Sequence, residues 1–292
     1  MLLNPFVVGY LPIPETWQVA VSYVFDVIVA LLFCAKEKVQ LWKAFDFHLV
    51  RIQTLLLTVV IFLAIQPIMT VIAGLTDRFI PSLMEVIKEQ MYAGNLFVNL
   101  VGISLIPAFF EEFLIRGALV GAYRRTGRLR ATILLSALAF GLLHANLSQF
   151  FYTFVAGIVL AALYILSGSI WPGILLHFLN NGASVVEEAI KQKYGEEVAK
   201  RAFYVSHMEL SPLAFALAFF GAAIIVFTLR AIAKQEGNER LLGPCVKGGD
   251  GTKRLITSAL VGAFVIVFLM TVLISGAAFI YKAGMIPEGL VG

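Results

Sequence analysis

Residues 103–123 read ISLIPAFFEEFLIRGALVGAY, and two adjacent carboxylates, Glu111 and Glu112, lie in the middle of this apolar stretch. A carboxylate at membrane depth costs about 3 kcal/mol or more unless it is paired, neutralised or hydrated, so such residues are rare and usually functional. On a helix, Glu112 and Arg116 are neighbours one turn apart, whereas Glu111 points away from Arg116. We therefore expect Glu112 to pair with Arg116 and Glu111 to have no partner on its own helix. The alternative is an interfacial acidic pair at a helix end, but apolar residues flank the pair on both sides.

The composition of the whole chain is that of a polytopic membrane protein. Of its 292 residues, 60% are hydrophobic and 14% are charged, whereas soluble domains are about 45–50% apolar and about 25% charged. We expect a single all-α membrane domain over residues 1–292, surrounded by membrane lipids. The net charge of +4 does not indicate a nucleic-acid partner, because excess Lys and Arg in a membrane protein mostly determine topology.

Eight segments are long and apolar enough to span a membrane. They are residues 17–35, 52–75, 95–116, 129–145, 149–167, 171–187, 211–233 and 255–281. We expect the third span to continue as a helix through Tyr123, and the short amphipathic segment 82–92 to form an interfacial helix. If the N-terminus is outside, most of the 22 Lys and Arg residues fall in inside segments, Arg116 among them. This excess favours both termini outside.

Glu111 and His144 are predicted to lie at the same depth. Glu111 precedes the turn glycine Gly127 by nearly as many positions as His144 follows it. If residues 95–125 and 128–145 form an antiparallel hairpin, both side chains lie ~25 Å from the turn, near mid-membrane. Considered alone, His144 would more often be a packed residue that donates a hydrogen bond to a backbone carbonyl.

A second polar pair, His177 and Asn181, lies one helical turn apart in WPGILLHFLNN, residues 171–181. Pro172 suits the start of this helix. By residue count, His177 fits the depth of Glu111 less well than His144 does. Hydrogen bonding between helices is an equally good interpretation of this pair alone. Taken together, a carboxylate, two imidazoles and an amide on separate spans resemble an active site more than packing.

Three further acidic residues lie in or beside predicted spans. Asp26 lies in the middle of the first span and has no partner on its own helix, and we assign it no role. Glu187 and Glu188 end the sixth span, where we expect them in the headgroup region with a structural role.

The candidate residues could act with or without a metal ion. One Glu and two His could bind zinc with an open fourth position, although the HExxH pattern is absent. Without a metal, Glu111 could act as general base toward a water that His144 also holds. His177 and Asn181 could then donate hydrogen bonds to a developing oxyanion. This arrangement matches amide hydrolysis by activated water; we expect no cofactor, and a polar cavity that admits water.

Three short motifs carry a family resemblance. EEFLIR (residues 111–116), FGLLH (140–144) and HFLNN (177–181) occur in this order on separate predicted spans. Together they resemble the Rce1-type CAAX endopeptidases (CAAX prenyl protease 2), which belong to the Abi or CPBP group of intramembrane proteases. SGSIWPGILLHFLNN, residues 167–181, is similar to the third motif region, including the turn before it. The resemblance covers about residues 95–187, which we expect to form the catalytic core.

The resemblance implies a role for each motif residue. Glu111 and His144 would activate water, and His177 and Asn181 would form the oxyanion hole. The supporting residues would be Glu112, Arg116 and Phe140.

The resemblance also implies a fold and a substrate. About eight helices would surround a cavity that opens to the cytosol, in the cell membrane of a prokaryote. The substrate would be a prenylated, CaaX-type protein or peptide, cut near its C-terminus. Two alternatives stay open: a non-catalytic bacteriocin-immunity or scaffold protein, and a proton-coupled transporter. A transporter would be expected to carry an inverted repeat, and the sequence contains no clear repeat.

Overall fold

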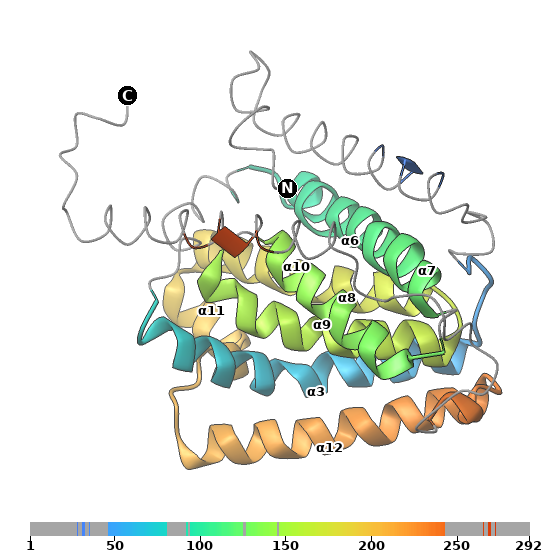
Figure 1. Ribbon diagram of the computed structural model, residues 1–292. Helices are drawn as coiled ribbons and strands as arrows, with labels where there is room; N and C mark the ends of the chain where they lie inside the picture. The colour runs from blue at the N-terminus through green and yellow to red at the C-terminus, as the bar shows by residue number, and fades with distance from the viewer. Residues whose placement is uncertain are drawn as a thin grey trace.

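The computed structural model describes residues 46–80, 92, 94–124, 127–144 and 146–242, with a few single positions nearer the two ends. These residues form a bundle of helices without a strand among them, so the predicted all-α class is confirmed for this part of the chain (Figure 1). Several predicted features fall outside the described residues, apart from single positions. They are the spans 17–35 and 255–281, Asp26, and segment 82–92 except for Tyr92.

The helical elements follow one another with short connections. In chain order they are α3 (Ile52–Asp77), α5 (Leu96–Asn99), the π-helical η2 (Leu100–Leu105), α6 (Ile106–Glu112), the π-helical η3 (Phe113–Val120), α7 (Gly121–Tyr123), α8 (Leu129–Leu143), α9 (Leu147–Ser167), α10 (Trp171–Tyr194), α11 (Glu196–Ala202), the 3₁₀ turn η5 (Tyr204–His207), α12 (Pro212–Gln235) and the 3₁₀ turn η6 (Glu239–Leu242).

Four helices of the described part are long and apolar enough to cross a membrane. They are α3, the continuous helix Leu96–Val120, α9 and α12. Each corresponds to a predicted span, and together they make the chain an integral membrane protein. α8 is a shorter apolar helix. α10 is not among the four, because polar residues interrupt its apolar face. The count of eight spans therefore stays a prediction.

Local sequence signals set where several helices begin and end. The Ser211 side chain accepts a hydrogen bond from the backbone N–H of Ala214 at 3.3 Å, and so caps α12. Pro172 occupies the first turn of α10, as its sequence position predicts. The helix α9 ends at Gly168, whose φ is 68°. Glycine adopts this left-handed conformation without strain. The turn lets α10 fold back against α9.

Two glycines allow unusually close helix packing. A Cβ on Gly221 of α12 would clash with the carbonyl oxygen of Ala64 in α3, and a Cβ on Gly157 of α9 would lie 2.8 Å from Cα of Ala137 in α8. Larger residues would push these helices apart. In Figure 1, α12 runs along α3, on the opposite side of the bundle from α6. The acidic pair therefore lies far from α12.

Candidate active site

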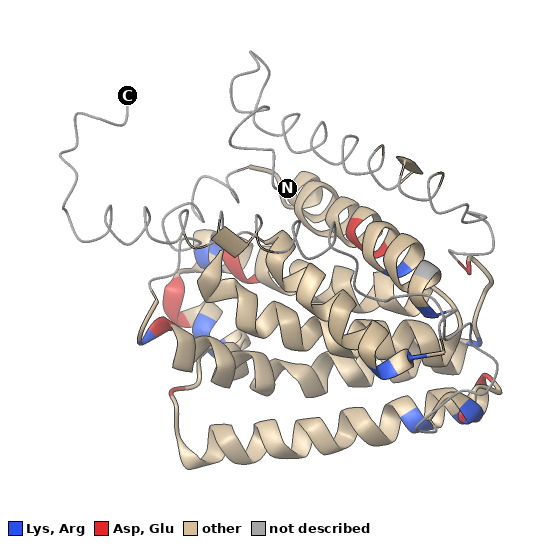
Figure 2. Cartoon of the chain, viewed as in Figure 1, with Lys and Arg blue, Asp and Glu red and all other residues tan. Residues whose placement is uncertain are grey.

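The helix that carries Glu111 and Glu112 changes from α-helical to π-helical on both sides of the segment α6. Glu111 and Glu112 are the last two residues of α6, which lies between the π-helical segments η2 and η3. The predicted continuation through Tyr123 is confirmed, but the helix is not uniformly α-helical. Figure 2 shows charged positions in the middle of this helix, whereas most others gather near helix ends. π-helical turns inside α-helices are frequent at functional sites.

The predicted pairing of Glu112 with Arg116 is confirmed. Nη1 of Arg116 donates to Oε1 of Glu112 at 2.9 Å, and both side chains are fully buried. Nη2 of Arg116 also donates to the carbonyl oxygen of Gly157 at 3.2 Å. Arg116 is thus an interior cation, and its use as a loop charge in the topology prediction was wrong. Its helical spacing put it beside a carboxylate that compensates its charge inside the bundle.

His177 lies between the two carboxylates. Its Nδ1 is 3.1 Å from Oε1 of Glu112, and its Nε2 is 3.8 Å from Oε2 of Glu111. Since an ionised carboxylate can only accept, Nδ1 carries the hydrogen and donates it to Glu112. Glu111, which is 5% exposed, therefore meets an imidazole from α10.

The close approach of α10 depends on a glycine that was not predicted from the sequence. Gly173 lies one turn before His177, and a Cβ on it would be 3.0 Å from Oε2 of Glu112. The absence of a side chain at Gly173 brings the first turns of α10 against the buried carboxylate.

His144 makes the packing contact expected of a lone histidine. It follows the last residue of α8, and its Nδ1 lies 2.9 Å from the carbonyl oxygen of Phe140. Because the carbonyl accepts, Nδ1 carries the hydrogen, and Nε2 of the neutral ring is an acceptor. His144 is also within electrostatic range of Glu111 and His177. The hairpin around Gly127, where φ is 73°, brings α8 back against η3.

Phe140 contacts three of the candidate side chains. Its ring meets the rings of His144 and His177 edge to face, with centroid distances of 5.1 and 5.4 Å. The guanidinium carbon of Arg116 lies 4.5 Å from the same ring centroid. Residues from three helices thus meet at one buried aromatic ring, and the supporting role of Phe140 stays a prediction.

Asn181 lies one turn beyond His177 on α10 and is half-buried. Its neighbour Asn180 accepts a hydrogen bond from the side-chain amide of Gln66 in α3 at 3.4 Å. The Ser104 hydroxyl donates to the carbonyl oxygen of Phe178 at 2.7 Å. These two contacts hold α10 against α3 and η2. Gln66 and Ser104 were not predicted from the sequence, although polar residues inside apolar spans are a signal that could have indicated them.

The acidic residues near the C-terminal end of α10 belong to a different cluster of side chains. The helix continues past the predicted span end to Tyr194. Glu187 pairs with Nε2 of His207 at 2.8 Å, and Glu188 is buried. Burial, followed by the charges of Glu188 and Glu187, raises the pKa of Tyr92 to about 12. These contacts agree with a structural role.

Two predictions about the surroundings of the site are not tested. The first is metal-free chemistry. No group of three or more His, Cys, Asp and Glu side chains within the described ranges could hold a metal ion, but the preference for a metal-free reaction stays a prediction. The pocket described below lies at the junction of α3 and α12 and contains none of the candidate residues. The predicted polar cavity beside Glu111 also stays a prediction.

The fold and this cluster define an integral membrane protein with a buried acid–imidazole site. A family model described as type II CAAX prenyl endopeptidase Rce1-like matches residues 93–183, which include all three motifs. The resemblance to this family is therefore confirmed over that segment. No curated protein and no solved structure matches the chain.

Proposed function

We propose that this protein is an intramembrane endopeptidase that hydrolyses a peptide bond near the C-terminus of prenylated, CaaX-type proteins or peptides in a prokaryotic cell membrane. The observation that carries the proposal is that Glu111, His144 and His177 come together from three helices. Both imidazole rings meet the ring of Phe140, and Nε2 of His177 lies 3.8 Å from Oε2 of Glu111. The family match over residues 93–183 supports the reaction class.

Glu111 and His144 would hold the attacking water through its hydrogens. The Glu111 carboxylate is an acceptor, and so is Nε2 of His144, because its Nδ1 faces the Phe140 carbonyl. A water that donates to both keeps a lone pair for the substrate carbonyl carbon. As the C–O bond forms, Glu111 takes one proton from the water. It returns that proton to the amide nitrogen as the C–N bond breaks.

His177 and Asn181 would stabilise the oxyanion of the tetrahedral intermediate. The Asn181 amide supplies an N–H donor in either protonation state of the site. His177 already uses Nδ1–H on Glu112, so its Nε2 can donate to the oxyanion only when the ring is doubly protonated. Glu112 is thereby a positioning residue for His177, and Arg116 balances its charge.

The proposal is tested with Glu111→Gln, which keeps the size of the side chain and removes the base. We expect cleavage of a farnesylated CaaX peptide in proteoliposomes to fall about 10³-fold. Glu209→Gln is the matched control, because Glu209 is an exposed carboxylate outside the cluster. Mass spectrometry of the products locates the cut, and elution as a single species on size exclusion reports folding.

Two outcomes would contradict parts of the mechanism. Normal turnover by a folded Glu111→Gln variant would reject the assignment of the base. Loss of wild-type activity in phenanthroline, restored by added zinc, would reject the metal-free route while leaving the peptidase activity in place.

A further inference from the structure

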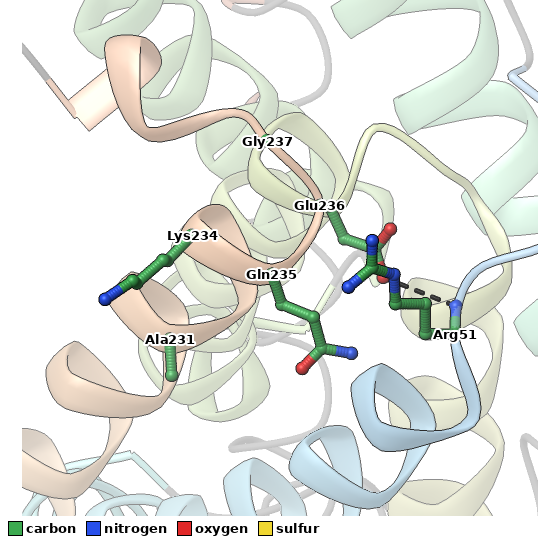
Figure 3. Close-up of a pocket in the computed structure, with 6 residues that line it drawn as sticks. All are labelled: Arg51, Ala231, Lys234, Gln235, Glu236 and Gly237. Atoms are coloured by element: carbon green, nitrogen blue, oxygen red, sulfur yellow. Dashed lines mark hydrogen bonds between the residues drawn. The ribbon is translucent and has the colours of Figure 1, made fainter.

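An open pocket lies where the start of α3 meets the end of α12. Its volume is about 650 Å³, within the range of about 300–1,000 Å³ that small-molecule sites occupy. Figure 3 shows the six residues that line it, which come from these two helix ends. They are Arg51, Ala231, Lys234, Gln235, Glu236 and Gly237. The charge distribution predicts that this end of the bundle faces the cytosol.

Two cations of the pocket are available to a ligand. The Arg51 and Lys234 side chains are exposed, and Figure 3 shows them on either side of Gln235. Among the described residues, neither takes part in an ion pair. Arg51 also precedes the first turn of α3, whose N–H groups add positive potential at the same place.

The acidic residue of the pocket is already engaged. Oε1 of Glu236 accepts from the backbone N–H of Arg51 at 3.3 Å and from the Thr54 hydroxyl. The Gln235 amide donates to the same Thr54 hydroxyl at 3.1 Å. These bonds join the two helix ends and use Glu236 as a structural acceptor. The pocket keeps a net positive charge at its rim.

The surface beside the pocket is apolar and exposed. Ile52 and Leu56 on the first turns of α3, and Phe227 on α12, are 63%, 61% and 67% exposed in the described bundle. Both helices are long enough to cross a membrane. A molecule whose anionic headgroup occupied the pocket would therefore have the exposed apolar side chains of α3 and α12 beside it.

We propose that this pocket binds the phosphate headgroup of an anionic phospholipid, with the acyl chains along α3 and α12. The cations select the negative charge, and the adjoining apolar faces select a lipid over a soluble anion. The site is separate from the candidate active site and does not depend on the proposed peptidase activity.

Native mass spectrometry of the full-length protein in mild detergent tests this proposal. We expect phosphatidylglycerol to bind the wild type more tightly than phosphatidylcholine. The double variant Arg51→Gln/Lys234→Gln should bind phosphatidylglycerol about 25-fold more weakly, about fivefold for each cation removed. Both side chains are exposed, so the variant should elute as the wild type does.

The control variant is Arg78→Gln/Arg201→Gln, which removes two exposed cations elsewhere in the bundle. It should retain wild-type binding. Equal loss of phosphatidylglycerol in the control, or unchanged binding by Arg51→Gln/Lys234→Gln, would overturn the proposal. Displacement of the lipid by excess inorganic phosphate would also overturn it, since the pocket would then be a site for a free anion.

Discussion

Two ion pairs of this molecule have the same spacing and nearly the same length but opposite surroundings. Glu112–Arg116 and Glu196–Lys200 are both one helical turn apart, at 2.9 and 2.8 Å. The first pair is fully buried, whereas Lys200 and Glu196 are 44% and 57% exposed. An exposed pair contributes little because water screens it. A buried pair leaves an uncompensated charge in the interior when one partner is lost. Spacing predicts that a pair forms, and burial decides what its loss costs.

The largest effect is expected for Arg116→Met. This change leaves the buried Glu112 charge without its cation and should destabilise the protein by about 3–5 kcal/mol. The measurement is the thermal midpoint in detergent, followed by the fraction that stays monodisperse. Glu112→Gln/Arg116→Met should recover part of the loss, because glutamine is neutral and its carbonyl still accepts from His177. A double variant no more stable than Arg116→Met would contradict this explanation.

A smaller loss is expected for Gly173→Ala, which tests the close approach of α10. The added Cβ would lie 3.0 Å from Oε2 of Glu112, so the carboxylate or α10 must give way slightly. Because Arg116 and His177 hold this carboxylate, we expect a cost of about 1–3 kcal/mol. Gly102→Ala is the matched control on a neighbouring helical segment, because no heavy atom lies within 4 Å of its added Cβ. Equal thermal midpoints for the two variants would show that the contact at Gly173 does not limit packing.

Unfolding at alkaline pH tests whether burial also shifts the pKa of a group outside the predicted spans, the phenol of Tyr92. The Tyr92 pKa of about 12 is above the ordinary tyrosine value of 10.0, so the folded state favours the neutral phenol. That stabilisation is complete below pH 10 and is lost as pH rises toward 12; at pH 11 the loss is about 1 kcal/mol. The wild type should therefore lose more stability between pH 9 and 11 than Tyr92→Phe. Tyr204→Phe, at an exposed position, should behave as the wild type does.

The smallest effect is expected for Lys200→Gln. The hydrogen bond to Lys200 lowers the pKa of Glu196, and the same bond raises the pKa of Lys200. The contribution of Glu196 is present above its unfolded pKa and disappears as pH falls through the folded value. Solvent screens both groups, so the thermal midpoint should not change measurably between pH 5 and 8. A clear drop would show that the exposed pair matters as much as the buried one.

Features that depend on local spacing and hydropathy could be predicted from the amino-acid sequence alone. The sequence predicted the helical membrane class, the Glu112–Arg116 pair, the turn at Gly127 and the start of α10 at Pro172. The ordered motifs also predicted the family resemblance over about residues 95–187, and the family model matches residues 93–183. Such signals can be read directly because periodicity, turn residues and apolar length act within one segment of the chain.

How the helices meet could not be predicted from the sequence and became visible in the folded bundle. The tertiary structure placed His177 between two carboxylates, joined Gln66 to Asn180, and brought Phe140 against three polar side chains. It also introduced the π-helical segments around α6. These features depend on how closely distant helices approach, which small residues such as Gly173 control. Helical periodicity predicts the face on which a side chain lies, but not the distance to the neighbouring helix, which is set by packing of the whole bundle.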